Sequence, residues 1–183
     1  MIGGEIMTKP ICYVMVGLPA SGKSTRVENM CDMDLDAFVY STDNYIEQCA
    51  KVNGWTYDQA FSEFIDPATK HMNEMLDVAI RSKQNVIWDQ TNLGVKKRRA
   101  IINRMKHVGY AVECECYIPP ETVEDIAEWN SRLHNRSGKT IPDNIVENMA
   151  KTFVIPTLDE GFDQINFWNI HGVLLNIKEA NNA

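Results

Sequence analysis

The sequence has no apolar run long enough to cross a membrane. A membrane-spanning helix needs roughly 20 predominantly apolar residues, and no stretch of this 183-residue chain approaches that length. The first ten residues carry Glu5 before any apolar run, which is not the pattern of a secretory signal. We therefore expect a cytoplasmic protein that does not act at a membrane.

Cysteine is scarce, and its spacing argues against disulfide and zinc frameworks. The chain has five cysteines, an odd number, and none of them forms a C-x-x-C pair. Its four histidines show no metal-ligand spacing. Reduced, mostly buried thiols are therefore expected. The cysteines are Cys12, Cys31, Cys49, Cys114 and Cys116.

Basic residues are outnumbered along most of the chain, which argues weakly against a protein that coats nucleic acid with its whole surface. The net charge is −7, from 18 basic and 25 acidic side chains, yet residues 61–110 reverse the balance with 9 basic and 5 acidic. A local basic patch on an acidic body suits a polyanionic substrate held at one place, and a solvated helix face explains the segment equally well. The concentrated cations are Lys96, Lys97, Arg98, Arg99, Arg104 and Lys106.

Internal repeats, low-complexity tracts and linkers are absent from the sequence, so we expect a single domain over residues 1–183. Apolar strand-like runs alternate with segments of helical period, which predicts an α/β fold: a parallel sheet of about five strands with helices on both faces. Functional residues should follow the strands, because their carboxyl ends share one edge. The expected strands are 11–16, 37–41, 85–89, 111–118 and 165–170. The expected helices are 23–31, 44–52, 67–82, 95–108, 121–133 and 143–153, with a short helix near 55–64.

Residues 17–25, GLPASGKST, fit the phosphate-binding pattern G-x-x-x-x-G-K-[ST] and directly follow the first expected strand. The two glycines allow a tight turn whose N–H groups point at phosphate oxygens, and a helix starting near Lys23 adds its positive end. Lys23 is expected at the β and γ phosphates and the Ser24 hydroxyl on Mg²⁺. The pattern predicts binding of ATP or another nucleoside triphosphate. The predicted contacts are Gly17, Ser21, Gly22, Lys23, Ser24 and Thr25.

Asp43 comes two residues after the second expected strand, at the edge where ligands bind. A carboxylate at this place can accept the proton of an attacking hydroxyl, the role of the base in kinase-type phosphoryl transfer. It can also cap the helix expected to start at Asn44, since aspartate is favoured at that position. The two roles are compatible.

Asp89 ends the third expected strand and is followed by Gln90, Thr91 and Asn92. An aspartate at a strand end beside a phosphate loop can hold Mg²⁺ directly or through water. Thr91 and Asn92 offer short polar groups that can orient a substrate hydroxyl or phosphate. Capping of the helix expected from residue 95 is the competing interpretation for Asn92.

Arg132 and Arg136 lie in a polar turn between two expected helices. Such a turn is typical of a mobile lid, here expected over residues 121–142, which closes on a triphosphate and brings positive charge to the transferring phosphoryl group. Exposed loop arginines are, however, usually only solvated. Phosphate loop, strand-end aspartates and arginine lid, in this order, are the layout of a small P-loop kinase.

With these motifs the chain resembles the kinase domain of the polynucleotide 5′-hydroxyl kinase family, the phage-type enzymes in particular. The resemblance covers roughly residues 10–155. The segments that carry it are residues 17–25, residues 41–45 (STDNY), residues 89–93 (DQTNL) with 97–99 (KRR), and residues 130–132 (NSR) with 136–142 (RSGKTIP) and Met149.

The resemblance implies a P-loop kinase fold and transfer of the γ-phosphoryl group of ATP to the 5′-hydroxyl end of DNA or RNA, with Mg²⁺. It implies that Asp43 is the general base and that Lys23 and the lid residues Arg132 and Arg136 are catalytic. The phosphate loop and the strand end give Ser24 and Asp89 as the expected metal ligands, and the resemblance implies acceptor contacts at Asp89, Thr91 and Asn92. Residues 96–99, which include Arg98 and Arg99, are expected as a further contact with the acceptor.

The chain departs from the phage-type pattern after the base. Ile46 and Glu47 stand where those enzymes carry an arginine for the acceptor phosphate, and Gln90 stands where some have an acidic residue. A kinase for a nucleoside, a nucleotide or another small metabolite is therefore the main alternative. A nucleotide-dependent switch without catalysis is a third.

Overall fold

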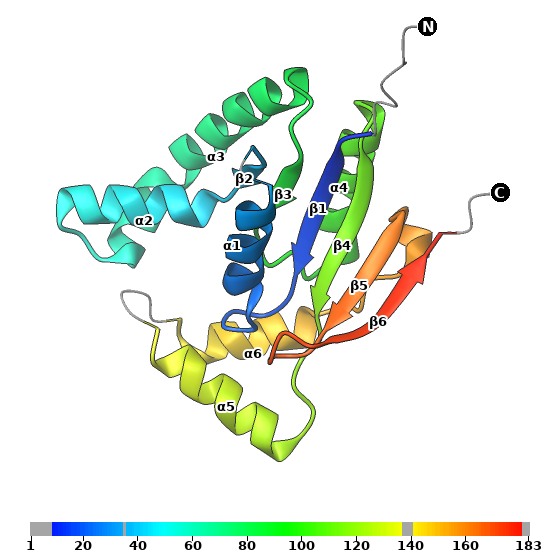
Figure 1. The fold of residues 1–183 in the computed structure, drawn as a ribbon. Helices are drawn as coiled ribbons and strands as arrows, with labels where there is room; N and C mark the ends of the chain where they lie inside the picture. Colours follow the sequence, from blue (N-terminus) through cyan, green and yellow to red (C-terminus); the bar gives the residue numbers. More distant parts are fainter. Residues whose placement is uncertain (1–8, 35, 137–140, 181–183) are drawn as a thin grey trace, which may run out of the picture.

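The computed structural model describes residues 9–34, 36–136 and 141–180, and these form a six-stranded sheet with helices on both faces (Figure 1). The strand order is β2-β3-β1-β4-β5-β6; the first five strands are parallel, and β6 is antiparallel to β5. The predicted α/β P-loop kinase fold is confirmed. The strands are β1 (Ile11–Val16), β2 (Phe38–Tyr40), β3 (Val86–Trp88), β4 (Ala111–Tyr117), β5 (Gln164–Trp168) and β6 (Leu174–Glu179).

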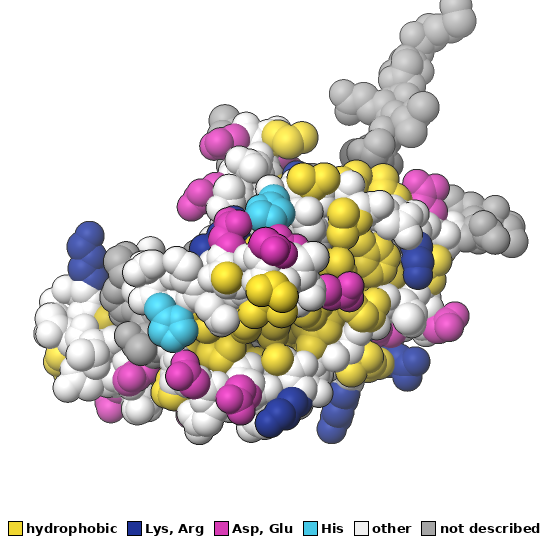
Figure 2. All heavy atoms as spheres, turned by 90° about the horizontal axis from the view of Figure 1, so that it is seen from below, with side chains coloured by type: hydrophobic (Ala, Val, Ile, Leu, Met, Phe, Trp, Pro, Cys, Tyr) yellow, Lys and Arg dark blue, Asp and Glu magenta, His cyan; other side chains and the backbone are white. Residues whose placement is uncertain are grey.

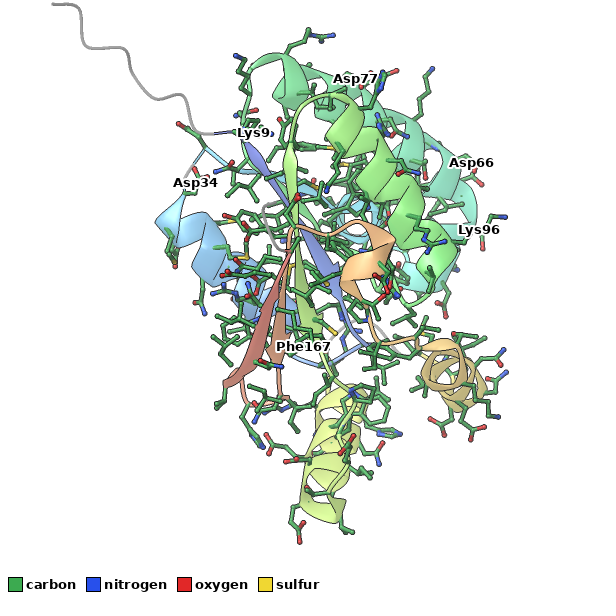
Figure 3. The ribbon with its side chains drawn as sticks, turned by 90° about the vertical axis from the view of Figure 1, so that its right-hand side faces the viewer. Lys9, Asp34, Asp66, Asp77, Lys96 and Phe167 are labelled. Carbon is green, nitrogen blue, oxygen red and sulfur yellow. The ribbon has the colours of Figure 1, made fainter. Side chains whose placement is uncertain are left out.

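Helices follow the parallel strands because each crossover must cover a sheet that is apolar on both faces. α1 packs Val27 and Met30 on one face, and α3 and α4 cover the other (Figure 3). The helices are α1 (Lys23–Met33), α2 (Thr42–Asn53), α3 (Tyr57–Arg81), α4 (Val95–His107), α5 (Val123–His134) and α6 (Asp143–Thr152), with a short 3₁₀ helix η1 (Leu158–Glu160). None of the helices in the described ranges is both long and apolar enough to span a bilayer.

α3 corrects the expectation of two helices, 55–64 and 67–82. It is one helix of 25 residues that runs through Pro67. A capping box of Thr56 and Gln59 fixes its first turn, and a buried stripe including Ala60, Ala68 and Leu76 continues across the proline. The free energy gained by packing one continuous face therefore outweighs the free energy lost with the backbone hydrogen bond that proline cannot make.

β6 is the strand that the sequence did not predict. Ile177 stands between Asn176 and Lys178, and every residue of the strand is exposed, so it does not have the pattern of a buried strand. A tight turn closes the hairpin: the Asn169 side chain accepts hydrogen bonds from the N–H groups of His171 and Val173, and Gly172 takes a positive φ of 74°. This Asn…Gly turn was the available signal.

The buried cysteines were predicted correctly. Cys12, Cys114 and Cys116 lie in the main core and all five cysteines are free thiols. Burial raises the pKa of Cys116 to about 12, which keeps it a neutral, inert thiol. The core cysteines are therefore not candidates for catalysis. The candidate functional residues lie at the carboxyl edge of the sheet, where the loops after β1, β2 and β3 meet.

Candidate active site

The phosphate loop connects β1 to α1 and has the shape that its glycines allow. Gly22 is the N-cap of α1 with φ 103°, in the left-handed region. A Cβ on Gly17 would approach Ser21 Oγ to 2.9 Å, and a Cβ on Gly22 would approach Tyr117 Cε1 to 3.1 Å. Side chains at either position would therefore crowd a loop whose backbone must stay open to phosphates.

Lys23 is the buried cation of this loop. Its Nζ donates hydrogen bonds to the carbonyls of Gly17 at 2.9 Å and Leu18 at 2.6 Å. Burial lowers the pKa of Lys23 to about 8. The charges of Asp89 and Asp43 oppose that shift and the charge of Arg136 adds to it. The charges of two carboxylates and of a lid arginine therefore act on the lysine.

Asp43 lies in the first turn of α2 and is exposed. It is not the helix cap: Ser41 is, and its Oγ accepts from the N–H of Asn44 at 3.4 Å. The alternative interpretation of Asp43 as an N-cap is therefore wrong. Its Oδ1 instead accepts a hydrogen bond from Tyr57 Oη at 2.9 Å.

The loop after β3 joins the phosphate loop to α2. Gly17 N donates to Thr91 O at 3.1 Å, and Gln90 Nε2 donates to Thr42 Oγ1 at 3.1 Å. These bonds tie the loop that carries Asp89 to the phosphate loop and to the start of α2. Asp89 and the exposed hydroxyl of Ser24 are the donors that fit Mg²⁺, which takes few protein ligands besides substrate phosphates. The described residues contain no cluster of three or more metal-binding side chains.

α5 lies against the phosphate loop. Trp129 Nε1 donates to Pro19 O at 2.8 Å, and an Arg132 guanidinium N–H donates to Ile170 O at 2.6 Å. Arg132 also pairs with Glu128. His171, beyond β5, bonds Asp125 of α5 at 2.8 Å and lowers the pKa of that carboxyl group. The predicted lid, 121–142, thus includes α5; its residues 137–140 lie outside the described ranges.

A cavity of about 580 Å³ opens between α1, α5 and the β5–β6 turn. Ser24 and Thr25 line it beside both lid arginines, Arg132 and Arg136. Figure 2 views this end of the molecule and shows hydrophobic side chains gathered across the face, with acidic side chains around them. The cavity adjoins the phosphate loop, whose Gly22 and Ser24 are part of its lining.

The match to known families fits this geometry. A family model described as "AAA domain" (AAA_33) matches residues 13–156, which is most of the chain. The chain belongs to this AAA domain family. The match includes the phosphate loop, both aspartates and the two lid arginines.

Relatives of this AAA domain include two kinases. Over 156 residues the chain is 27% identical to the L-seryl-tRNA(Sec) kinase of Methanococcus maripaludis, covering 82% of this chain and 55% of that protein. Over 154 residues it is 21% identical to the bifunctional polynucleotide phosphatase/kinase of Schizosaccharomyces pombe, covering 83% of this chain and 32% of that protein. The chain thus spans about half or less of the length of these relatives.

A solved structure shares the fold of the AAA domain. The PezAT chromosomal toxin-antitoxin system of Streptococcus pneumoniae matches with a TM-score of 0.65 at 16% identity, covering 100% of this chain and 76% of that chain. At this identity the likeness shows the fold alone.

Two of the predicted substrate contacts in the AAA domain are structural. Arg98 is 0% exposed and makes a two-pronged ion pair with Glu160, at 2.6 and 2.7 Å. It also donates to the carbonyls of Asn92 and Leu93. Asn92 is buried at a positive φ of 47°, and its Nδ2 donates to Met15 O at 2.8 Å. The prediction that these side chains contact substrate is corrected: they hold the loop after β3, because its carbonyls need buried donors.

Several cations of the basic segment are held in ion pairs and hydrogen bonds with side chains of the same protein, some of them at its surface. Arg104 donates to Asn73 and Asp77 of α3, and Lys106 pairs with Asp163. Lys96 points outward from α4 (Figure 3), and Arg99 is exposed. The interpretation of this segment as one continuous patch is therefore too simple. The first turn of α4 is the part of the segment that is open to a ligand.

Lys97 and Tyr57 are site residues that the sequence analysis did not assign. Burial of its ammonium group lowers the pKa of Lys97, and the charge of Asp43 opposes the shift. The residue as a whole is exposed. What matters for the site is that the positive charge of Lys97 lies near the negative charge of Asp43. Tyr57 comes from a helix start distant in sequence, and no local motif marked it.

The nucleotide cavity has a wall that no motif indicated. Arg26 lies over the Trp168 ring, 4.6 Å from its centroid. Buried Glu115 holds both: it accepts from Arg26 Nε at 3.1 Å and from Trp168 Nε1 at 2.6 Å, as well as from Asn166. Arg26 and Trp168 line the cavity, so a flat, rigid surface faces the ligand. In the sequence, this wall is reflected only in the alternation of Glu113 and Glu115 with cysteines.

Proposed function

We propose that this chain transfers the γ-phosphoryl group of ATP to the 5′-hydroxyl end of a DNA or RNA strand, with Asp43 as general base. The observation that carries the proposal is that hydrogen bonds from Gly17 N to Thr91 O and from Gln90 Nε2 to Thr42 Oγ1 join the phosphate loop, the loop after β3 and the start of α2. Lys23, Asp89 and Asp43 therefore lie on three joined segments at one edge of the sheet. A phosphate cradle, a carboxylate base and a lid cation at one sheet edge are what phosphoryl transfer needs.

The proposed reaction follows from these positions. The acceptor oxygen forms a bond to the γ phosphorus, the bond from that phosphorus to the β–γ bridging oxygen breaks, and ADP leaves. The hydroxyl proton passes to the carboxylate of Asp43. Lys23, Arg132 and Arg136 supply positive charge to the phosphates. Ser24 and Asp89 would hold Mg²⁺, which when bound neutralises phosphate charge.

Two observations support a hydroxyl carried by nucleic acid as the acceptor. Both kinase relatives are named for a nucleic-acid substrate, a tRNA in one and a polynucleotide in the other. The first turn of α4 carries Lys96, Lys97 and Arg99, all exposed, and Lys97 lies close enough to Asp43 for the two charges to interact. Cations at this place suit the phosphates that follow a 5′ end.

The test is transfer of label from γ-³²P-ATP to a 5′-hydroxyl oligonucleotide with Mg²⁺. We expect a labelled 5′ end with single-stranded DNA or RNA and no label on the same strand already 5′-phosphorylated. A protein that binds ATP but labels none of these strands at any Mg²⁺ concentration refutes the proposed acceptor.

A small-molecule acceptor is the second candidate, and one observation favours it. Arg98 is buried in its ion pair with Glu160, and Arg104 and Lys106 pair with side chains of the same protein at its surface, which leaves fewer cations for a long polyanion. Free nucleosides should then be phosphorylated, and oligonucleotide binding should vary little with salt. If several phosphates are bound, affinity falls steeply as salt rises, with a log–log slope near −0.7 per phosphate for a single strand.

A further inference from the structure

We propose that Tyr57 is a positioning residue for phosphoryl transfer, which fixes the carboxylate of Asp43 so that the group faces the acceptor hydroxyl. The inference rests on the proposed role of Asp43 as the base. It adds a partner that neither the motifs nor the family match assign.

The geometry of the pair is specific. Tyr57 Oη lies 2.9 Å from Asp43 Oδ1, although the two residues are 14 positions apart and belong to different helices. Tyr57 is the first residue of α3, and the capping box of Thr56 and Gln59 fixes that helix start.

The packing of α2 against α3 keeps the phenol in place. A small apolar cluster joins the helices through Ile46, Ala50, Ala60 and Ala68, and Tyr57 packs against it. The Tyr57 ring also contacts Phe61, with centroids 5.9 Å apart. The hydroxyl is thus carried by a ring that cannot easily turn away.

The phenol stays a hydrogen-bond donor over the working pH range. Burial raises the pKa of Tyr57, and the charge and hydrogen bond of Asp43 and the charge of Glu47 raise it further, while Arg136 opposes them. A neutral phenol beside a carboxylate donates its proton to the hydrogen bond, which favours the charged form of the carboxylate.

The charged groups around the pair come from four elements. They are Lys23 of α1, Glu47 of α2, Lys97 of α4 and Arg136 after α5. Tyrosine in its neutral form and phenylalanine have the same charge, so a Tyr57→Phe change leaves all four in place. Any shift in the pH profile of the variant then reports the lost hydrogen bond.

The experiment compares the pH profile of kcat for unaltered protein and Tyr57→Phe, with ATP and a 5′-hydroxyl oligonucleotide. We expect kcat to fall roughly tenfold, the size of one hydrogen bond to a charged group. The acidic limb should move up by about one pH unit, because a carboxylate without its donor is protonated more easily. KM for ATP should be unchanged.

Tyr45→Phe is the matched control. Tyr45 lies in α2, and its ring contacts that of His71 in α3, with centroids 5.1 Å apart. It should keep the kcat and pH profile of the unaltered protein. If Tyr57→Phe folds normally and its profile and kcat also match the unaltered protein, Tyr57 has only a packing role and the inference is wrong.

A readout without acceptor separates this inference from the proposed function. Carboxyl ¹³C NMR of the protein alone follows the titration of Asp43, assigned by the signal lost in Asp43→Asn. If no oligonucleotide is phosphorylated but Tyr57→Phe still moves the titration midpoint upward, the acceptor is wrong and the pair stands. A midpoint that does not move overturns the pair, whatever the acceptor is.

Discussion

At the scale of single residues, the ammonium group of Lys23 has partners before any nucleotide binds. It donates to the carbonyls of Gly17 and Leu18, which are neutral, and its pKa is lowered to about 8 by burial. A triphosphate brought to the same place is an anion that favours the charged lysine. Nucleotide binding should therefore change the protonation of this residue.

We predict that ATP binding takes up protons near pH 8. Near pH 8, Lys23 of the protein without nucleotide is partly neutral, and bound phosphates raise its pKa, so the lysine takes up a proton. Below about pH 7 the lysine is already charged, so its contribution to proton uptake vanishes. Calorimetric titration in buffers of different ionisation enthalpy measures the uptake. Lys23→Met should abolish it, and an uptake that persists in that variant assigns it to another group.

Asp43 and Asp58 allow a sharp test of the base. Both are acidic residues in the first turn of a helix, α2 and α3 respectively, so both complement the helix dipole. We predict that Asp43→Asn lowers kcat by roughly 10²–10⁴-fold, the usual contribution of a positioned base, and leaves ATP affinity intact. Asp58→Asn should change little in label-transfer assays. Equal losses in the two variants would point to helix stability instead.

At the scale of elements, α5 joins the two sides of the nucleotide cavity. Trp129 bonds the phosphate loop, and Arg132 and Asp125 bond the segment after β5. Polar contacts along the helix thus hold it in place, and Leu133 is its one buried residue. Elements with few buried apolar contacts open at low free-energy cost.

We predict that Trp129→Phe releases α5 without unfolding the protein. The change keeps an aromatic ring and removes the bond to Pro19, a loss of about 0.5–1.5 kcal/mol. Amide hydrogen exchange over Val123–His134 should become several-fold faster, while exchange in β1 and β4 stays the same. Trp55→Phe, at a ring that is 43% exposed, is the control. If exchange in α5 is unaltered, the bond does not hold the helix.

How far the sequence predicts elements depends on whether their signal is local. The strand-then-glycine pattern around residue 17 and the helix starting at Lys23 were predicted correctly, because turn geometry and burial are written in adjacent residues. Pro67 misled the prediction of α3, since the packing that carries the helix through it is tertiary. β6 was missed because an exposed edge strand needs no apolar run.

The same distinction between local and distant signals applies to the site residues. Lys23, Asp43 and Asp89 follow strands, and the common edge of parallel strands brings them together. Arg98 was misassigned because its partner Glu160 lies 62 residues away. Tyr57 and the Glu115–Trp168 contact likewise join distant segments. A single sequence gives the chemistry of each side chain but not which distant group it meets.

At the scale of the whole molecule, the Arg98–Glu160 pair connects the loop after β3 to η1 through the core. Arg98 also donates to the carbonyls of Asn92 and Leu93, so one side chain stabilises a loop, a helix start and the segment before β5. Removing either charge leaves the other buried without a partner.

We predict that Arg98→Met destabilises the fold by about 3–5 kcal/mol, the usual loss when one partner of a buried pair is removed. Urea unfolding followed by circular dichroism measures it. The double variant Arg98→Met/Glu160→Leu should lose less than the single, because no buried charge remains. Arg99→Ala, at the next and exposed position, should stay within about 0.5 kcal/mol. A mild effect of Arg98→Met would mean that water reaches Glu160.

The antiparallel direction of β6 fixes where both ends of the described part of the chain lie. Glu179 pairs with Gln164, the first residue of β5, so the last strand finishes beside the starting ends of the parallel strands, where β1 also begins. That side is opposite the phosphate loop. A fluorescent protein fused at either terminus, or a surface tether attached there, would therefore leave the catalytic side facing solution, and such immobilised protein should turn over substrate as fast as protein in free solution.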